Sequence, residues 1–235
     1  MYFHLSPLGD HAIVIELGDD INETVHRNVQ CVSHAIEQQS FEWLIEHIPA
    51  FTKVTVLYDP MKTPYVNAHE SPYEIVSKQL IRLLRTVKGS KVTRSRTVEI
   101  PVCYGGEYGP DLAYVAKVNH LTEEEVVHIH SQGTYTVYMI GFAPGFPYVG
   151  GMSERIATPR KQSPRLEIPA GSVGIAGKQT GVYPIATPGG WQLIGQTPLS
   201  LFDPNSTSPT LLQAGDTIVF KPITRQAYES YKEEK

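Results

Sequence analysis

Hydrophobic residues near the start of the chain repeat with the period of a helix in two places. Between Ile21 and Ile36 they recur at spacings of three and four, which puts them on one face of an amphipathic helix. A second such face runs from Ile75 to Val87. Ser71, followed by a proline and then by a glutamate three positions on, is a start signal for this second helix.

Short runs of branched and aromatic residues predict three strands around these helices, at residues 12–17, 43–48 and 53–58. The order strand, helix, strand, strand, helix predicts a small N-terminal α/β sandwich over residues 1–90, with a ferredoxin-like arrangement as one form of it. Residues 91–96 are basic and polar, so we expect a linker there.

The remainder, residues 97–235, predicts a second domain that is richer in strands. Strands are expected at residues 97–104, 135–141 and 217–220, and a short helix at residues 112–118. Another helix begins at Thr122, whose spacing to a glutamate three positions on is that of a capping box. The whole chain is therefore predicted to be α+β with two domains, the second a small barrel or sandwich.

One segment, residues 141–200, differs from the rest in composition, and we call it the signature segment. It holds 11 of the 19 glycines and 8 of the 18 prolines of the chain. Phenylalanine, tyrosine, tryptophan, isoleucine and valine are interspersed among them, which a flexible linker would lack. The pattern predicts short strands joined by tight turns, presenting backbone N–H groups and aromatic faces.

Charge adds a further expectation for the same segment. Between residues 151 and 200 there are five lysines and arginines against two glutamates, although the whole chain has a formal net charge of −4. A locally basic, glycine-rich surface is suited to a carboxylate or a phosphate. The alternative is a solvated loop face on which arginine stems lie over aromatic rings.

The overall composition is that of an ordinary globular protein, with 235 residues and 41% hydrophobic residues. A nucleic-acid-binding protein would usually be more basic, so no nucleic-acid partner is expected. The sequence contains no apolar run long enough to span a membrane, and its N-terminus lacks the features of a signal peptide. We therefore predict a cytoplasmic protein without a membrane partner, in which Cys31 and Cys103 are free thiols.

Several motifs that would carry autonomous catalysis fail on inspection. Residues 171–178 resemble a phosphate-binding loop, but Ser172 and Gln179 stand where its pattern requires glycine and Ser or Thr. Ala170 likewise breaks the nucleophile-elbow pattern around Ser172. His128 and His130 are two positions apart, so they do not share a helix face as a metal pair would. No metal site is predicted.

The signature segment contains the motifs GFAPGFPY at 141–148, PRKQSPR at 159–165, GSVGIAGKQTGVYP at 171–184 and PGGW at 188–191. These motifs resemble, in the same order, those of the allophanate hydrolase subunit 1 family, which also contains the sporulation kinase inhibitor KipI. The resemblance covers essentially the whole chain. It implies that the second domain is a cyclophilin-like β-barrel.

The resemblance also implies an activity, that of one subunit of an ATP-dependent 5-oxoprolinase. Such an enzyme converts 5-oxo-L-proline, ATP and water into L-glutamate, ADP and phosphate. The partners implied are two companion subunits, one carboxyltransferase-like and one LamB/YcsF-like. ATP is then a co-substrate whose site can be shared with another subunit. Residues 61–63 lack the context in which biotin is attached, so no biotin is expected on this chain.

On that basis two groups of site residues are predicted. The first would bind the substrate carboxylate or a phosphoryl group: Arg160, Arg165, Gly174, Ala176, Gly177, Lys178, Gln179, Thr180 and Gly181. The second would wall the pocket or form a partner groove: Phe142, Pro144, Phe146, Pro147, Tyr183, Pro188 and Trp191. The catalytic groups themselves are not assigned.

Two alternative functions stay open at this point. The same apolar, basic-rimmed groove would suit an inhibitor that grips the helical dimerisation domain of a sensor histidine kinase. The chain also resembles half of a biotin-dependent urea or allophanate-type carboxyltransferase. Both alternatives predict the same groove, so the residues alone do not separate them from the oxoprolinase function.

Overall fold

A computed structural model describes residues 1–64, 69–87 and 96–233 of the chain. Its contacts divide the chain into two compact units, Met1–Arg94 and Ser95–Lys235, and each is described by itself. Apart from Arg96, the predicted linker at 91–96 lies outside the described residues. No helix in the described ranges has both the length and the apolar character needed to cross a bilayer.

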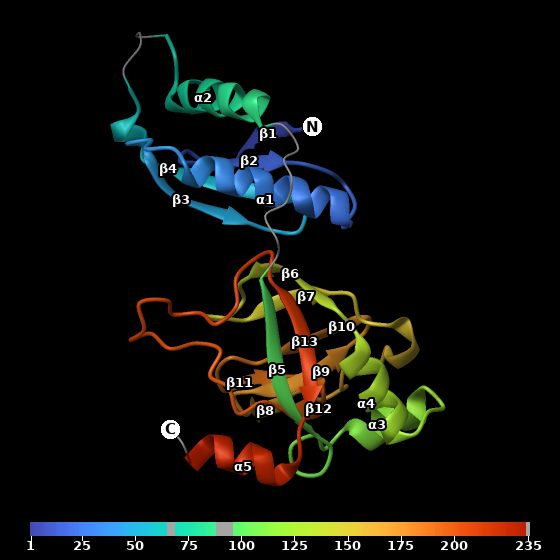
Figure 1. Cartoon of the computed structure of the whole chain (residues 1–235). Coiled ribbons are helices and arrows are strands. Elements are labelled where there is room, and N and C mark those ends of the chain that lie inside the picture. The colour runs from blue at the N-terminus through green and yellow to red at the C-terminus, as the bar shows by residue number, and fades with distance from the viewer. Residues whose placement is uncertain (65–68, 88–95, 234–235) are drawn as a thin grey trace. The chain divides into compact units, whose positions relative to one another are not determined.

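The first unit is a four-stranded antiparallel sheet with two helices (Figure 1). Its elements are β1 (His4–Pro7), β2 (Ala12–Glu16), α1 (Glu23–Glu37), β3 (Leu44–Pro49), β4 (Lys53–Tyr58), the short 3-10 helix η1 (Pro60–Lys62) and α2 (Pro72–Thr86). The predicted start of α2 is confirmed, because Ser71 and Glu74 form the reciprocal capping box. Strand β1 was not predicted.

The helices of the first unit cover one face of its sheet. Alternate residues of β2 and β4, such as Ile13, Ile15 and Val56, share a core with the apolar faces of α1 and α2. The strand order is β1-β2-β4-β3, so β4 lies between the two strands that α1 connects. That split β-α-β arrangement is part of a ferredoxin-like sheet. Here the fourth strand, β1, comes before the split β-α-β arrangement in the chain, and the ferredoxin-like class stays a prediction.

The second unit contains a seven-stranded sheet that is nearly closed into a barrel (Figure 1). The order is β10-β9-β12-β5-β13-β6-β7, and the end strands β10 and β7 contact each other. Its elements are β5 (Thr97–Tyr104), α3 (Leu112–Val118), α4 (Glu123–Gln132), β6 (Tyr135–Ile140), β7 (Pro147–Gly150), η2 (Glu154–Ile156), β8 (Arg165–Ile168), β9 (Ser172–Ala176), β10 (Gln179–Val182), β11 (Thr187–Gly189), β12 (Gln192–Gln196), β13 (Thr217–Pro222) and α5 (Arg225–Glu233). The predicted barrel is thus confirmed.

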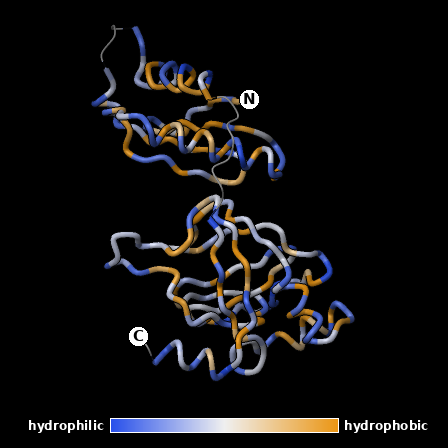
Figure 2. The backbone as a smooth tube through the Cα atoms, in the orientation of Figure 1, coloured by the Kyte–Doolittle hydropathy of each residue, from blue (hydrophilic) through white to orange (hydrophobic). Residues whose placement is uncertain are grey.

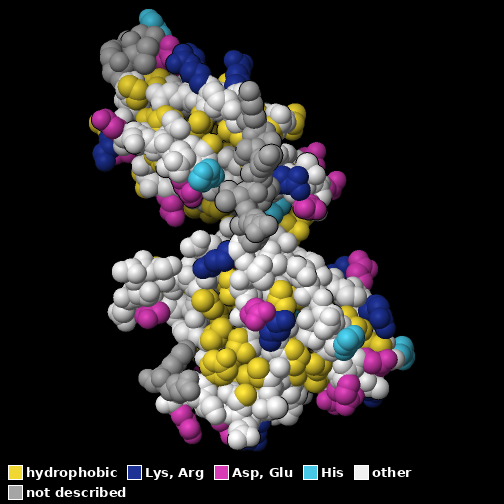
Figure 3. All heavy atoms as spheres, viewed as in Figure 1, with side chains coloured by type: hydrophobic (Ala, Val, Ile, Leu, Met, Phe, Trp, Pro, Cys, Tyr) yellow, Lys and Arg dark blue, Asp and Glu magenta, His cyan; other side chains and the backbone are white. Residues whose placement is uncertain are grey.

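The first and last strands of the barrel, β5 and β13, are neighbours in its sheet. They pair in parallel, beginning with Thr97 opposite Thr217. Hydrophobic stretches run along both strands (Figure 2). Ile100 and Phe220 point into the core, while Glu99 and Lys221 form an outward ion pair at 3.5 Å. Apolar side chains gather on the face of this unit that is turned toward the viewer in Figure 3.

The signature segment supplies the short strands that its composition predicted. Strands β7 to β12 all fall between residues 147 and 196, and β8 and β11 form a separate two-stranded sheet. Helix α5 was not predicted, because it is largely hydrophilic and buries mainly the ring of Tyr228 (Figure 2).

Candidate functional site

A cavity of about 250 Å³ opens among the loops and strands of the signature segment, and we call it the aromatic pocket. It brings together residues from the β6–β7 loop, β7, the Pro159 loop, β10 and β11. Its lining is Phe142, Phe146, Tyr148, Arg160, Gln179, Tyr183, Pro188, Gly189, Gly190 and Trp191. Seven of these ten were predicted as site residues from the sequence; Tyr148, Gly189 and Gly190 were not.

Phe146 is the centre of the aromatic wall. Its ring is edge-on to those of Tyr148, Tyr183 and Trp191, with centroids 5.3, 5.7 and 6.0 Å away. Such T-shaped pairs add to the stabilisation from buried area. Phe146 and Tyr183 are 4% and 3% exposed, so this wall belongs to the packed interior of the protein.

Phe142 is the exception among these aromatic residues. Its side chain is 73% exposed, and its backbone has φ 69°, the left-handed region that a bulky residue rarely adopts. The surrounding loop fixes that conformation, since Gly141 N–H donates to Phe146 O and Phe146 N–H donates to Ala143 O. A strained, exposed aromatic residue at the mouth of a cavity is typical of a functional position.

Four polar side chains line the aromatic pocket: Tyr148, Arg160, Gln179 and Tyr183. Arg160 is exposed and makes no ion pair or hydrogen bond within the described part of the chain. Burial raises the pKa of the Tyr183 hydroxyl to about 12, although the charges of Arg160 and Arg165 act in the opposite direction. Tyr183 is therefore a neutral hydroxyl at physiological pH, and Arg160 supplies the positive charge of the pocket.

Gln179 reaches the pocket because of the hairpin that precedes it. Gly177, with φ 58°, and Lys178 form the two-residue turn between β9 and β10. A glycine suits this turn because it adopts positive φ without strain. Successive residues of β10 then point to opposite sides, so Gln179 lines the pocket while Thr180 is buried on the other side.

The remaining predicted anion-binding residues lie outside the pocket lining. Gly174, Ala176 and Gly181 are buried in the paired strands β9 and β10. The N–H of Gly177 donates to Thr158 O at 2.7 Å. Lys178 is exposed in the turn and pairs with Glu154 at 2.7 Å. Their proposed contact with a phosphoryl group stays a prediction.

Arg165 lies at the start of β8 and holds a buried carboxylate instead of lining the pocket. Its Nη2 donates to Asp111 at 2.8 Å, and the Leu193 N–H donates to the same carboxylate at 2.7 Å. Lys161 Nζ is 3.4 Å away. Burial alone would raise the pKa of Asp111, but the hydrogen bonds from Arg165 and Leu193, with the two positive charges, lower it. Asp111 was not predicted as a site residue.

Pro144, Pro147 and Pro188 shape the rim. Pro144 is exposed in the β6–β7 loop, and Pro147 is the buried first residue of β7, opposite Ile140. Pro188 lies in β11 and lines the cavity. Next to it, Gly189 is required by packing, because a Cβ there would lie 2.7 Å from Tyr183 Oη. Two prolines of the predicted groove therefore support its walls, and one contacts the cavity.

A buried hydrogen-bonded chain links β5, α4 and the β9–β10 hairpin. His130 Nε2 is 2.9 Å from Thr180 Oγ1, which donates to Gly174 O at 2.9 Å. Because that hydroxyl proton is used, Nε2–H of His130 donates to Thr180, and Nδ1 accepts from Tyr104 Oη at 2.7 Å. Burial lowers the pKa of His130 to about 3, so the imidazole is neutral. His130 is therefore a buried histidine whose two ring nitrogens are both hydrogen-bonded.

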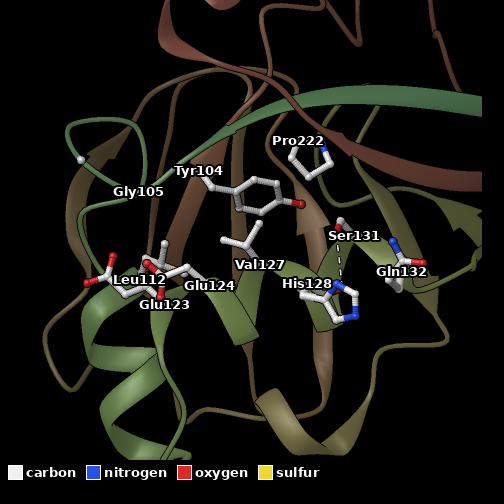
Figure 4. A pocket seen from close by; sticks show the side chains of 11 residues that line it. Tyr104, Gly105, Leu112, Glu123, Glu124, Val127, His128, Ser131, Gln132 and Pro222 are labelled. Atoms are coloured by element: carbon white, nitrogen blue, oxygen red, sulfur yellow. Dashed lines mark hydrogen bonds between the residues drawn. The ribbon is translucent and has the colours of Figure 1, made fainter.

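A larger hollow of about 570 Å³ lies beside α4 and has a different chemistry (Figure 4). Tyr104, Glu123, Glu124 and His128 are among its lining residues, and we call it the acidic hollow. Among the described residues, no lysine or arginine lines it to balance the two glutamates. Size alone would favour this hollow, but a carboxylate or phosphate ligand would be repelled there.

Within the described ranges, no group of three or more His, Cys, Asp and Glu side chains is placed to hold a metal ion. The polar side chains of the aromatic pocket carry a guanidinium, an amide and two phenol hydroxyls. Such a set suits an anion or an amide rather than a hard cation.

Comparison with known proteins places the chain in a class. Residues 3–212 match the family model described as "Carboxyltransferase domain, subdomain C and D". The solved structure of the protein TTHA0988 superimposes with a TM-score of 0.77 at 32% identity, over 90% of this chain. This chain spans 40% of that longer protein.

Two curated relatives match nearly end to end, and both are named as the B component of 5-oxoprolinase. The protein from Bacillus subtilis is 55% identical over 99% of this chain and 98% of its own length. The protein from Escherichia coli O157:H7 is 42% identical over 92% of this chain and 94% of its own length. The chain therefore belongs to the carboxyltransferase subdomain C and D family, among its 5-oxoprolinase B components. The resemblance seen in the signature motifs is confirmed.

Proposed function

We propose that this chain is one subunit of an ATP-dependent 5-oxoprolinase and that its aromatic pocket binds 5-oxo-L-proline. The full-length similarity to 5-oxoprolinase B components supports the enzyme class. The substrate assignment is carried by Arg160, whose guanidinium has no partner among the described residues and which lines the same aromatic cavity as Gln179. In this reaction the lactam opens to L-glutamate, and ring opening and ATP hydrolysis each consume one water molecule.

The groups in the pocket match those of the substrate. 5-Oxo-L-proline is a flat five-membered lactam that carries one carboxylate. Arg160 would pair with that carboxylate, since a guanidinium binds carboxylates with two parallel hydrogen bonds. The Gln179 amide can donate to the lactam oxygen and accept from the lactam N–H. A cavity of about 250 Å³ has room for several water molecules of about 30 Å³ each, and therefore for a small metabolite in their place.

The aromatic wall would exclude water from the lactam and strengthen these polar contacts. Phe142 at the mouth is placed to cover the bound ring. Tyr183 keeps its proton because burial raises its pKa to about 12, so it is a neutral hydrogen-bond donor next to Arg160. These residues bind, orient and desolvate the substrate.

The described lining of the aromatic pocket includes no carboxylate, thiol or imidazole that would activate water. Opening an unstrained amide requires such a group together with ATP. We assign the missing groups to the two companion subunits, one carboxyltransferase-like and one LamB/YcsF-like. The pocket would then be one wall of a composite active site.

The test is ATP-dependent release of glutamate from 5-oxo-L-proline. It is measured with this chain alone, with the two companion subunits together, and with all three mixed. We expect activity in the triple mixture only. Lack of glutamate release from an assembled, well-folded triple complex would reject the proposal.

A further inference from the structure

A second cavity shares Arg160 with the aromatic pocket. Its volume is about 500 Å³, which is in the usual range for sites of nucleotide-sized and drug-sized ligands. We call it the basic hollow. Its lining is Tyr114, Pro159, Arg160, Lys161, Gln162, Ser163 and Gln192. Only Arg160 among these residues was assigned to a site from the sequence.

The charge around the basic hollow is positive. Arg160, Lys161 and Arg165 are opposed by the carboxylate of Asp111, which contacts both Lys161 and Arg165. Three positive charges against one negative charge leave a net charge of +2. Asp111 already accepts from three donors, so the guanidinium of Arg160 stays available. An anion would therefore be attracted to the side of the hollow that borders the aromatic pocket.

The loop that carries these cations is held in place. Lys161 N–H donates to Gly190 O at 2.7 Å, and the buried side chain of Gln192 donates to Pro159 O at 2.9 Å. A binding loop fixed before the ligand arrives loses less conformational freedom on binding. The hydroxyl of Ser163 and the amide of Gln162 add neutral hydrogen-bonding groups to the same wall.

The hollow is also lined by an exposed aromatic residue. Tyr114 lies on α3 and is 48% exposed. A large exposed aromatic face beside a cluster of cations is the combination that recognises a nucleotide, because bases stack on aromatic rings and phosphates pair with cations. The described lining of the acidic hollow, although larger, lacks the cations that this would need.

We propose that the basic hollow binds the base and phosphates of a nucleoside triphosphate, with Arg160 placed between its terminal phosphate and the ligand of the aromatic pocket. The inference rests on the proposed function, in which that nucleotide is ATP and the neighbouring ligand is 5-oxo-L-proline. One arginine then touches both substrates, which brings the terminal phosphate within reach of the lactam. The phosphoryl group would pass to the lactam oxygen as its bond to ADP breaks, and two water molecules would then open the ring and release phosphate, giving L-glutamate. Tyr114 acts on the nucleotide alone.

The experiment measures binding of the non-hydrolysable analogue AMP-PNP with Mg²⁺ by calorimetry, on this chain alone and on the assembled complex. Removing the stacking ring in Tyr114→Ala should weaken binding about fivefold or more, while Tyr114→Phe retains it. Arg160→Gln should weaken it about tenfold, the effect of one lost charge-assisted hydrogen bond. Lys117→Gln, an exposed cation on α3 outside the hollow, is the matched control and should change nothing.

The two substitutions also separate the two substrates. Tyr114→Ala should leave the KM for 5-oxo-L-proline within about twofold of wild type, and Arg160→Gln should raise it, because Arg160 borders both cavities and Tyr114 borders one. Circular dichroism confirms folding of each variant. The inference is overturned if AMP-PNP binds to neither preparation, or if neither substitution changes its affinity.

The two proposals fail in different ways. In the first case the complex releases glutamate, but Tyr114→Ala and Arg160→Gln leave its AMP-PNP affinity unchanged. That result would reject the nucleotide site and retain the oxoprolinase function. A complex without glutamate release, in which AMP-PNP binds and both substitutions weaken it, rejects the oxoprolinase function and keeps the nucleotide site.

Discussion

The aromatic pocket and the acidic hollow belong to the same unit, yet they differ in size, in wall chemistry and in charge. The first is smaller, has rings packed around Phe146 and carries the positive charge of Arg160. The second is more than twice as large and carries Glu123 and Glu124. On the proposed function, charge sign and wall chemistry rather than volume distinguish the cavity that suits an anionic substrate.

The largest expected effect concerns the wall of the aromatic pocket. Phe146→Ala should lower the free energy of unfolding by about 3–5 kcal/mol, because a buried ring in contact with four others is replaced by a cavity. Chemical denaturation measures it. The control is Phe142→Ala, whose side chain is 73% exposed and whose loss should cost about 1 kcal/mol or less. Equal losses for the two variants would contradict a wall built around Phe146.

The second prediction compares the effects on kcat/KM of one substitution in the aromatic pocket and one in the acidic hollow. Arg160→Gln should lower kcat/KM for 5-oxo-L-proline in the assembled complex about a hundredfold, or about 2.7 kcal/mol, because it removes the charge that we propose binds the carboxylate. Glu124→Gln, in the acidic hollow, should change kcat/KM less than about twofold. A stronger effect at Glu124 would move the substrate site to the acidic hollow.

A third prediction separates Arg165 from Arg160. Arg165→Ala should lower the free energy of unfolding by about 1–3 kcal/mol, because the buried Asp111 carboxylate loses its shortest side-chain donor. Lys178→Ala breaks an exposed ion pair with Glu154 and should leave stability unchanged within error. Denaturation of the two variants checks this. An Arg165→Ala chain as stable as wild type, but inactive in the complex, would return Arg165 to the substrate site.

The last prediction concerns the pH dependence of stability that His130 causes. Its pKa is about 3 in the folded chain and about 6.5 when unfolded, so between these values the unfolded chain binds more protons. Stability therefore falls as pH falls through this window, by at most about 1.4 kcal/mol per unit for this group. His130→Gln should remove this contribution and flatten the decline between about pH 6 and pH 4. An unchanged slope would show that His130 does not stay neutral.

Much of this architecture was predictable from local patterns. Helix α2 follows from Ser71 and Glu74, which form the capping box seen in the structure. The composition of the signature segment predicted aromatic faces among tight turns, and the family resemblance then assigned Phe146, Tyr183 and Trp191 to the pocket wall. By contrast, β1 is four residues long and ends at Pro7, and α5 buries mainly Tyr228, so neither has a clear hydrophobic period.

The site was predicted less well where long-range contacts decide a residue's role. Arg160 and Arg165 look alike in the sequence, but Arg165 meets Asp111, which is 54 positions away, and Arg160 has no such partner within the described residues. Alternation along β10 would have separated Gln179 from Thr180 once the turn at Gly177 had been recognised. Asp111 carried no local signal, because its role depends on β12 and β8.

The parallel pair of β5 and β13 has a consequence for biosynthesis. The first strand of the barrel completes its hydrogen bonding only with the last one, and Arg96 meets Asp216 across 120 positions of sequence. Contacts this far apart in the chain slow folding, because a long loop must close before they form. During synthesis on the ribosome, one edge of β5 therefore stays unpaired until β13, about 120 positions later, has emerged. A strand edge that stays unpaired during synthesis is therefore a consequence of this fold's topology.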